Sequence, residues 1–189
     1  MPTVTGICNK ALSRIGANPI TNITESTREA RACKAVYDTI LDEMLEQAQW
    51  NFAIKRATLA QDSGTPEYDY SYQYLLPADC IRMLNVYPVS EYRVEGGMVR
   101  SNETTLQCRY LARITDASKY PPSFTRAMSL LLASEIALPI AGDTEGSGKK
   151  MNILKEFYDV ALPAAMSRDA RECGETQAEY QSDWASEGR

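Results

Sequence analysis

The stretch QWNFAIKRATLA, residues 49–60, contains the point where the sequence changes from a helical to an extended pattern. Two aromatic residues, Trp50 and Phe52, come first, and two cations, Lys55 and Arg56, follow them. Aromatic residues interleaved with basic ones are typical of surfaces that bind single-stranded nucleic acid. The alternative is a helix end that turns into a buried strand. We favour the alternative: the aromatic residues pack a sheet against the helices, and the cations lie in solvent or pair with a neighbouring subunit.

Two helices are predicted before this stretch. The first has Thr3 as its N-cap, carries apolar residues at three-and-four spacing, and ends at Gly16, where a positive φ is tolerated. The second is expected to begin with a capping box, in which Ser26 and Glu29 each bind the other's backbone N–H. Its wide apolar stripe continues to about residue 48.

Strands are predicted after this stretch. Alternating apolar residues between positions 70 and 115 favour a small antiparallel sheet. Gly96 and Gly97 stand between two of the predicted strands, and a pair of glycines is typical of a tight hairpin turn.

Two further helices complete the pattern. The third is expected to begin at Pro121 and Pro122 and to end near Leu138, because Pro139 cannot continue the helix without a kink. A solvated loop at residues 142–150 then leads to a fourth helix at about residues 147–173. Its expected apolar face consists of Ile153, Leu154, Phe157, Ala161, Leu162, Ala165, Met166 and Ala170.

The predicted fold is α+β and mainly α. Residues 1–60 and 116–173 form a four-helix bundle, and residues 61–115 form an inserted β-region. Residues 174–189 form an extended C-terminal tail, because they contain too few apolar residues to build a core.

Composition excludes several classes of chemistry. The chain has no histidine and five widely spaced cysteines without a C-x-x-C pair, which opposes a zinc site and a Ser-His or Cys-His nucleophile. The net charge of −5 opposes dedicated nucleic-acid binding. No phosphate-binding glycine motif occurs, and the longest apolar run is too short to cross a bilayer. We therefore predict a protein with no catalytic residues, no cofactor, no metal and no membrane association.

Five segments in a fixed order resemble the tail tubular protein A family, the head-to-tail adaptors of short-tailed bacteriophages. They are NKALSRIGANPI (9–20), STREARACKAVYDTILDEML (26–45), WNFAIKRATLA (50–60), YQYLLPADCIRMLNV (72–86) and RYLARITDASKYPPSFTRAMSLLLASEIALPI (109–140). The resemblance covers about residues 5–172. Beyond it, Asp183-Trp184 is similar to a short C-terminal tryptophan motif of the family.

The resemblance implies a structural role in the neck of a virion, for a protein made in the host cytoplasm. It implies a homo-oligomeric ring, a dodecamer in the family, between the portal protein of the capsid and the nozzle protein of the tail. Genomic double-stranded DNA would pass through the channel without sequence-specific binding. An acidic chain suits such a channel, because carboxylates on its wall repel phosphate.

Two sets of residues are predicted to dock partners. Tyr180 and Trp184 lie in an acidic segment and are candidates for portal docking, since aromatic anchors dominate many interfaces. The alternative is that this segment folds on its own subunit or has no fixed structure. Tyr87 and Tyr92 are candidates for the face toward the nozzle, within a tyrosine-rich region that also contains Tyr68, Tyr70 and Tyr72. About half of these five tyrosines are expected simply to pack the sheet.

Two other functions are compatible with the sequence. The chain could be a different neck or tail-completion protein whose ring binds another partner. It could also be a glycan hydrolase that uses two carboxylates, for which Glu67 with Asp69 or Asp79 with Glu91 could be nominated. Asp79, within Leu-Pro-Ala-Asp, is better explained as a residue that caps a turn.

Overall fold

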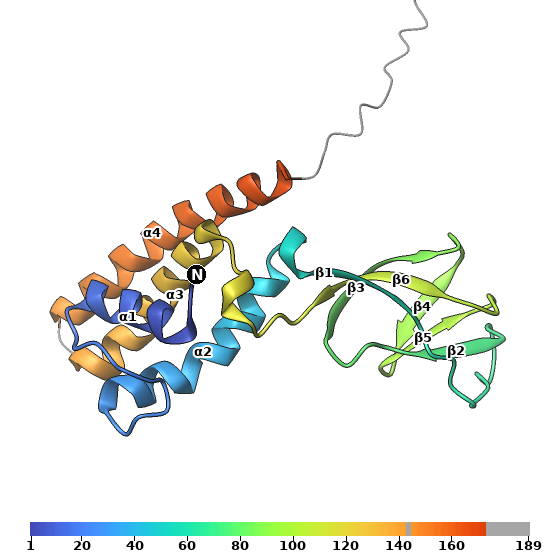
Figure 1. The fold of residues 1–189 in the computed structure, drawn as a ribbon, viewed down its shortest axis with the longest axis horizontal. Helices are drawn as coiled ribbons and strands as arrows, with labels where there is room; N and C mark the ends of the chain where they lie inside the picture. The colour runs from blue at the N-terminus through green and yellow to red at the C-terminus, as the bar shows by residue number, and fades with distance from the viewer. Residues whose placement is uncertain (143–144, 173–189) are drawn as a thin grey trace, which may run out of the picture.

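The computed structural model describes residues 1–142 and 145–172, with helices at one end and two sheets at the other (Figure 1). The helices are α1 (Val4–Ile15), α2 (Arg28–Glu46), α3 (Pro122–Ala141) and α4 (Glu145–Ala170). The strands are β1 (Ile54–Thr58), β2 (Tyr72–Leu75), β3 (Cys80–Tyr87), β4 (Tyr92–Glu95), β5 (Met98–Ser101) and β6 (Gln107–Ala112).

The predicted four-helix bundle is wrong: the described residues form a mixed α+β fold in which no such bundle is evident. Instead, α3 lies at the centre of the helical part and packs against α1, α2 and α4. It buries 12 of its 20 residues on all sides. A bundle helix buries one stripe and leaves the opposite face in water, so a helix that is apolar all round is surrounded instead.

The same property gives α3 the length and apolar composition of a membrane span. However, 67% of its most apolar window is buried within the structure, as expected for a helix at the centre of a packed core. Among the described residues, this is the one helix with such a composition.

Several predicted helix ends are confirmed. Thr3 is the N-cap of α1, and its hydroxyl oxygen accepts the Gly6 N–H at 3.1 Å. Gly16 ends α1 at a φ of 77°. α3 begins at Pro122, but it continues past Pro139 to Ala141 instead of ending before the proline.

The predicted capping box of α2 is wrong by one residue. Thr27, not Ser26, is the N-cap, and its Oγ1 accepts the Ala30 N–H at 3.3 Å. The cause is Glu25, whose Oε1 accepts the Thr27 hydroxyl at 2.9 Å and so turns the lone pairs of this hydroxyl toward the helix. The predicted capping box involved only Ser26 and Glu29, whereas the cap also depends on Glu25, which precedes the helix.

α4 begins earlier than predicted and buries less of its length. The helix was predicted to begin at about residue 147, within a segment interpreted as a solvated loop, but it begins at Glu145. Of the expected apolar face, Leu154 and Ala165 are buried. In contrast, Ile153 is 49% exposed and Phe157 is 59% exposed.

The β-part consists of two three-stranded antiparallel sheets, where one small sheet was expected. Sheet A has the order β1-β6-β3 and sheet B the order β2-β5-β4. The hairpin between β4 and β5 is confirmed: Gly96 and Gly97 have φ values of 59° and 77°, as a tight turn with two left-handed residues requires.

An aromatic cluster joins the two parts, as expected for Trp50 and Phe52. Trp50 is fully buried, and its indole N–H donates to the Met44 carbonyl at 2.7 Å, in the last turn of α2. Both aromatic rings lie 5.0 Å from the ring of Phe124 near the start of α3. Phe52 is half-buried and also contacts Tyr120.

Polar contacts reinforce this junction. The Arg113 guanidinium, just after β6, binds Asp38 and Asp42 of α2. The backbone N–H of Asn51 donates to Asp169 Oδ2 at 2.8 Å, which ties the end of α4 to the start of the β-part. The sheets are therefore held to the helices at α2, α3 and α4.

Candidate protein-interaction surface

The exposed side of sheet A carries two arginines in one row across the sheet. Arg56 of β1 lies opposite Arg109 of β6, and Arg109 lies opposite Asn85 of β3. Residues paired in this way project from the same face, with Cβ atoms about 5 Å apart. The strand register therefore places two guanidinium groups side by side.

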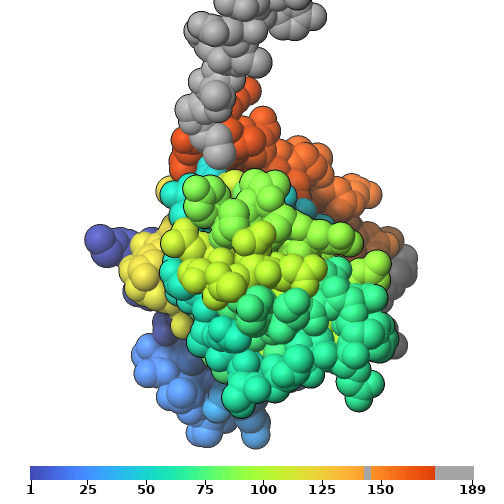
Figure 2. All heavy atoms as spheres, turned by 90° about the vertical axis from the view of Figure 1, so that its right-hand side faces the viewer, coloured from blue at the N-terminus to red at the C-terminus, as the bar shows by residue number. Residues whose placement is uncertain are grey.

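The next row continues the same face. Thr58 of β1 and Tyr87 of β3 flank Gln107 of β6. Together with Arg56, Arg109 and Asn85, these residues form what we call the sheet-A face. The face borders a hollow of about 550 Å³, in the end of the molecule that Figure 2 turns toward the viewer.

The sheet-A face is cationic without local compensation. None of the described residues that line the hollow is acidic. Neither Arg56 nor Arg109 forms an ion pair with a described residue. Like charges directly opposite each other destabilise a sheet. An anion bound between Arg56 and Arg109 would therefore relieve the repulsion between their guanidinium groups.

Large apolar groups beside the arginines are also exposed. Tyr87 is 68% exposed and Val89 is 93% exposed, and both line the hollow. Tyrosine and arginine are enriched at protein interfaces, where a ring supplies contact area and a guanidinium binds carboxylates in a forked geometry. The surface can therefore bind an acidic protein segment that also carries apolar side chains.

Charges on the opposite face of sheet A are compensated. Lys55, which we expected in solvent or against a neighbouring subunit, pairs with Asp79 of its own chain at 2.6 Å. The Tyr110 hydroxyl donates to the same carboxylate at 3.1 Å. The hydrogen bond from Lys55, with that from Tyr110, lowers the pKa of Asp79 against the opposing effect of desolvation. Burial, with the carboxylate beside it, raises the pKa of Tyr110 to about 12.

The structure also shows where the two carboxylate pairs considered for a glycan hydrolase lie. Asp79 uses its carboxylate in a structural ion pair, and no described contact joins it to Glu91. Glu67 and Asp69 lie exposed in the connection before β2. No group of three or more possible metal ligands occurs among residues 1–142 and 145–172.

The described cysteines are free thiols. Cys8, Cys33 and Cys108 are buried and Cys80 is half-buried, while Cys173 lies outside the described residues. Burial raises the pKa of Cys80 and of Cys108, which disfavours their reactive thiolate forms.

The structure separates the two tyrosines predicted to face the nozzle. Tyr87 ends β3 in sheet A and is exposed, whereas Tyr92 begins β4 in sheet B and is half-buried. Tyr68 is also exposed, and Tyr70 and Tyr72 are half-buried. Tyr180 and Trp184, the residues predicted to dock the portal, lie outside the described residues.

The sequence did not predict that Arg56 and Arg109 lie side by side. The signal that it offers is one arginine in the interior of each of the strands β1 and β6. Their meeting depends on the register between two strands separated by about 50 residues of chain, which no local pattern fixes.

No family model matches this chain. No curated protein matches it significantly either.

Proposed function

We propose that the chain is a structural head-to-tail adaptor of a phage virion, with no catalytic role. Copies of it would form a ring, dodecameric as the resemblance implies, between portal and nozzle. The observation that carries this proposal is the sheet-A face, where unpaired arginines and an exposed tyrosine border one hollow. Such a surface suits recognition of protein, and it belongs to the β-part, which lies at the other end of the molecule from the helices (Figure 1).

The division into two ends suits a protein that joins two partners. The sheet-A face would meet the nozzle protein, with Tyr87 as the apolar anchor and Arg56 and Arg109 as the charged groups. The helical part and the segment with Tyr180 and Trp184 would meet the portal. Neighbouring subunits would close the ring through two different surfaces of each copy.

The charge balance suits a conduit for DNA. The chain carries 25 acidic and 20 basic residues. Carboxylates on the channel wall would repel the phosphates, so that the genome passes without sequence-specific contacts. The arginines of the sheet-A face would then point to a protein partner and not into the channel.

The test is an assembly experiment with purified proteins. The mass of the chain is measured alone, with portal rings, and with portal rings plus nozzle protein. We expect a defined multiple of the chain to join the portal and the nozzle to bind that complex. Arg56→Glu combined with Arg109→Glu should prevent nozzle binding and leave portal binding intact.

The matched control is Arg93→Glu combined with Lys119→Glu, since these two cations are exposed and lie outside both the sheet-A face and the four α-helices. A chain that never joins the portal contradicts the adaptor proposal. A ring that joins the portal but binds a different tail component favours the alternative neck or tail-completion role. Nozzle binding that survives reversal of Arg56 and Arg109 removes the sheet-A face from the proposal.

A further inference from the structure

α4 carries a stripe of apolar side chains that no described residue covers. Ile153, Phe157, Val160 and Ala164 follow one another at spacings of four, three and four residues, so they lie on one side of the helix. Phe157 is 59% exposed and Val160 is 73% exposed. We call these four residues the α4 stripe. Exposed apolar groups that form a continuous patch mark a binding surface more often than scattered ones do.

Phe157 stands between two hollows along this stripe. The first, of about 330 Å³, lies toward the start of α4 and is also lined by Ile153 and Leu130. The second, of about 340 Å³, lies toward the end of α4 and is also lined by Val160 and Ala164. Each hollow is large enough for one aromatic side chain, and their centres are about nine residues apart along α4, or ~13 Å.

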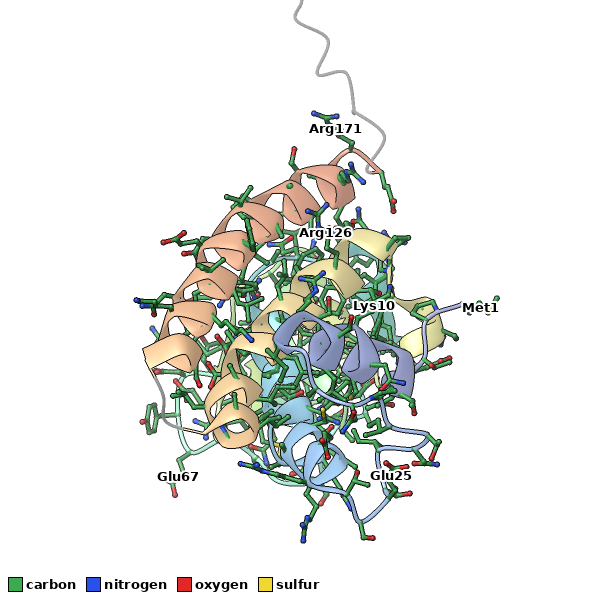
Figure 3. All side chains as sticks on the ribbon, turned by 90° about the vertical axis from the view of Figure 1, so that its left-hand side faces the viewer. Met1, Lys10, Glu25, Glu67, Arg126 and Arg171 are labelled. Carbon is green, nitrogen blue, oxygen red and sulfur yellow. The ribbon has the colours of Figure 1, made fainter. Side chains whose placement is uncertain are left out.

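Basic residues border both hollows. Arg14 and Lys150 line the first hollow, and Arg126 and Arg168 line the second. In Figure 3, Arg126 on α3 lies on the side of the helical part that faces the viewer, beside α4.

These cations are close to one another and lack acidic partners. Arg14, Arg126 and Arg168 form no ion pair with a described residue. Desolvation and the nearby charge of Arg126 lower the pKa of Arg14. The surface therefore fits a segment with two aromatic residues and several carboxylates.

The sequence after α4 has this composition. Residues 174–189 contain four carboxylates and one cation. Their two large apolar residues, Tyr180 and Trp184, are four positions apart, and each directly follows a carboxylate, Glu179 or Asp183. Four residues of extended chain span ~13 Å, which equals the separation of the two hollows.

We propose that residues 174–189 fold back along α4 of the same chain and place Tyr180 and Trp184 in the two hollows on either side of Phe157. Chain order assigns Tyr180 to the second hollow, which is nearer the end of α4, and Trp184 to the first. From Glu172, eight residues of extended chain reach ~26 Å and twelve reach ~40 Å. The hollows lie ~15 Å and ~28 Å back along α4, so both are within reach.

Covalent linkage favours the same chain over a second copy. A short linker holds a segment near its site at an effective concentration of about 1 mM, far above the concentration of free subunits in a dilute solution. If the segment alone binds with a Kd of about 0.1 mM, about nine in ten chains carry it docked. Portal binding by Tyr180 and Trp184 would then require their release from α4.

The test uses the fluorescence of Trp184 in the full chain. The chain has two tryptophans, and Trp50 is fully buried, so the difference between the unmodified chain and Trp184→Phe isolates the emission of Trp184. We expect this emission to be blue-shifted and poorly quenched by acrylamide. Phe157→Gln should weaken docking about tenfold, as loss of a central aromatic anchor does. The exposed fraction of Trp184 then rises about fivefold, from about a tenth to about a half.

A charge variant, Arg126→Glu with Arg168→Glu, should also expose Trp184. The matched controls are Tyr68→Gln, which removes an aromatic group that is 69% exposed elsewhere, and Arg31→Glu. Because the substituted side chains of the described residues, namely Arg31, Tyr68, Arg126, Phe157 and Arg168, are exposed, the melting temperature of these variants should stay within a few degrees and report intact folding.

Three outcomes overturn the proposal. Trp184 could be freely quenched in the unmodified chain, or equally protected after Phe157→Gln. Protection could also grow with protein concentration, which would identify a second copy as the occupant. None of these measurements involves portal or nozzle protein, so their failure leaves the adaptor proposal standing.

Discussion

Replacing Trp50 by phenylalanine should destabilise the junction between the helices and the sheets. The substitution removes the indole N–H that donates to the Met44 carbonyl at 2.7 Å, near a helix end where carbonyls lack intrahelical donors. A buried carbonyl left without a donor costs about 1–3 kcal/mol. The smaller ring also buries ~40 Å² less apolar surface, which costs about 1 kcal/mol. We therefore expect a loss of about 3 kcal/mol in the free energy of unfolding.

Thermal unfolding and urea titration measure this loss. For a chain of this size, 1 kcal/mol corresponds to about 2–4 °C, so the melting temperature should fall by about 9 °C. Phe52→Leu is the matched control: Phe52 is half-buried in the same cluster and has no polar group, and it should cost about 1 kcal/mol. If Trp50→Phe costs no more than Phe52→Leu, the hydrogen bond to α2 does not hold the junction as argued.

Three further substitutions probe separate features of the fold. Arg113→Leu removes partly exposed ion pairs to Asp38 and Asp42 of α2 and should lower the free energy of unfolding by about 1 kcal/mol in urea titrations. The loss should be smaller in high salt, which screens the ion pairs. An unchanged free energy of unfolding in low salt would show that these ion pairs do not stabilise the junction. Burial raises the pKa of Asp169, so the folded state binds the carboxyl proton more tightly than the unfolded chain does. The protonated carboxyl therefore contributes to stability at low pH, and this contribution is lost as the pH rises through the raised pKa. Asp169→Asn should therefore gain stability over the unmodified chain as the pH rises above the ordinary carboxyl range, and a difference that is constant with pH would refute this. Gly97→Ala forces a side chain into a φ of 77° and should cost about 1 kcal/mol by thermal unfolding, whereas Gly97→Asn should cost less.

Local features of the fold were predictable from the sequence because each is decided within a few residues. Thr3 and Gly16 bound α1 as expected, since a cap depends on its own side chain and the next turn. The Gly96-Gly97 hairpin follows from the backbone freedom of two glycines. The shift of the α2 cap to Thr27 shows the limit of such reasoning, because an acidic residue just outside the motif decided it.

Features that depend on distant segments were not predictable. The apolar sequence of α3 indicates a helix, but its central position depends on which elements surround it. The pairing of Arg56 with Arg109 depends on strand register, and the exposure of Phe157 depends on where α3 leaves α4 uncovered. The candidate surfaces are therefore products of the tertiary arrangement, although every residue in them is visible in the sequence.

Net charge is a weak guide to what this protein binds, because location separates the charges. The chain is acidic overall, yet among its described residues unpaired cations border the hollow of the sheet-A face and the two hollows beside the α4 stripe. Each of these places combines a guanidinium group with an exposed aromatic ring, Tyr87 in one case and Phe157 in the other. An anion that binds there gains a charge-assisted contact next to apolar area, and the repulsion from carboxylates elsewhere is screened within about 8–10 Å in salt. An acidic chain can therefore bind acidic protein segments at particular places on its surface.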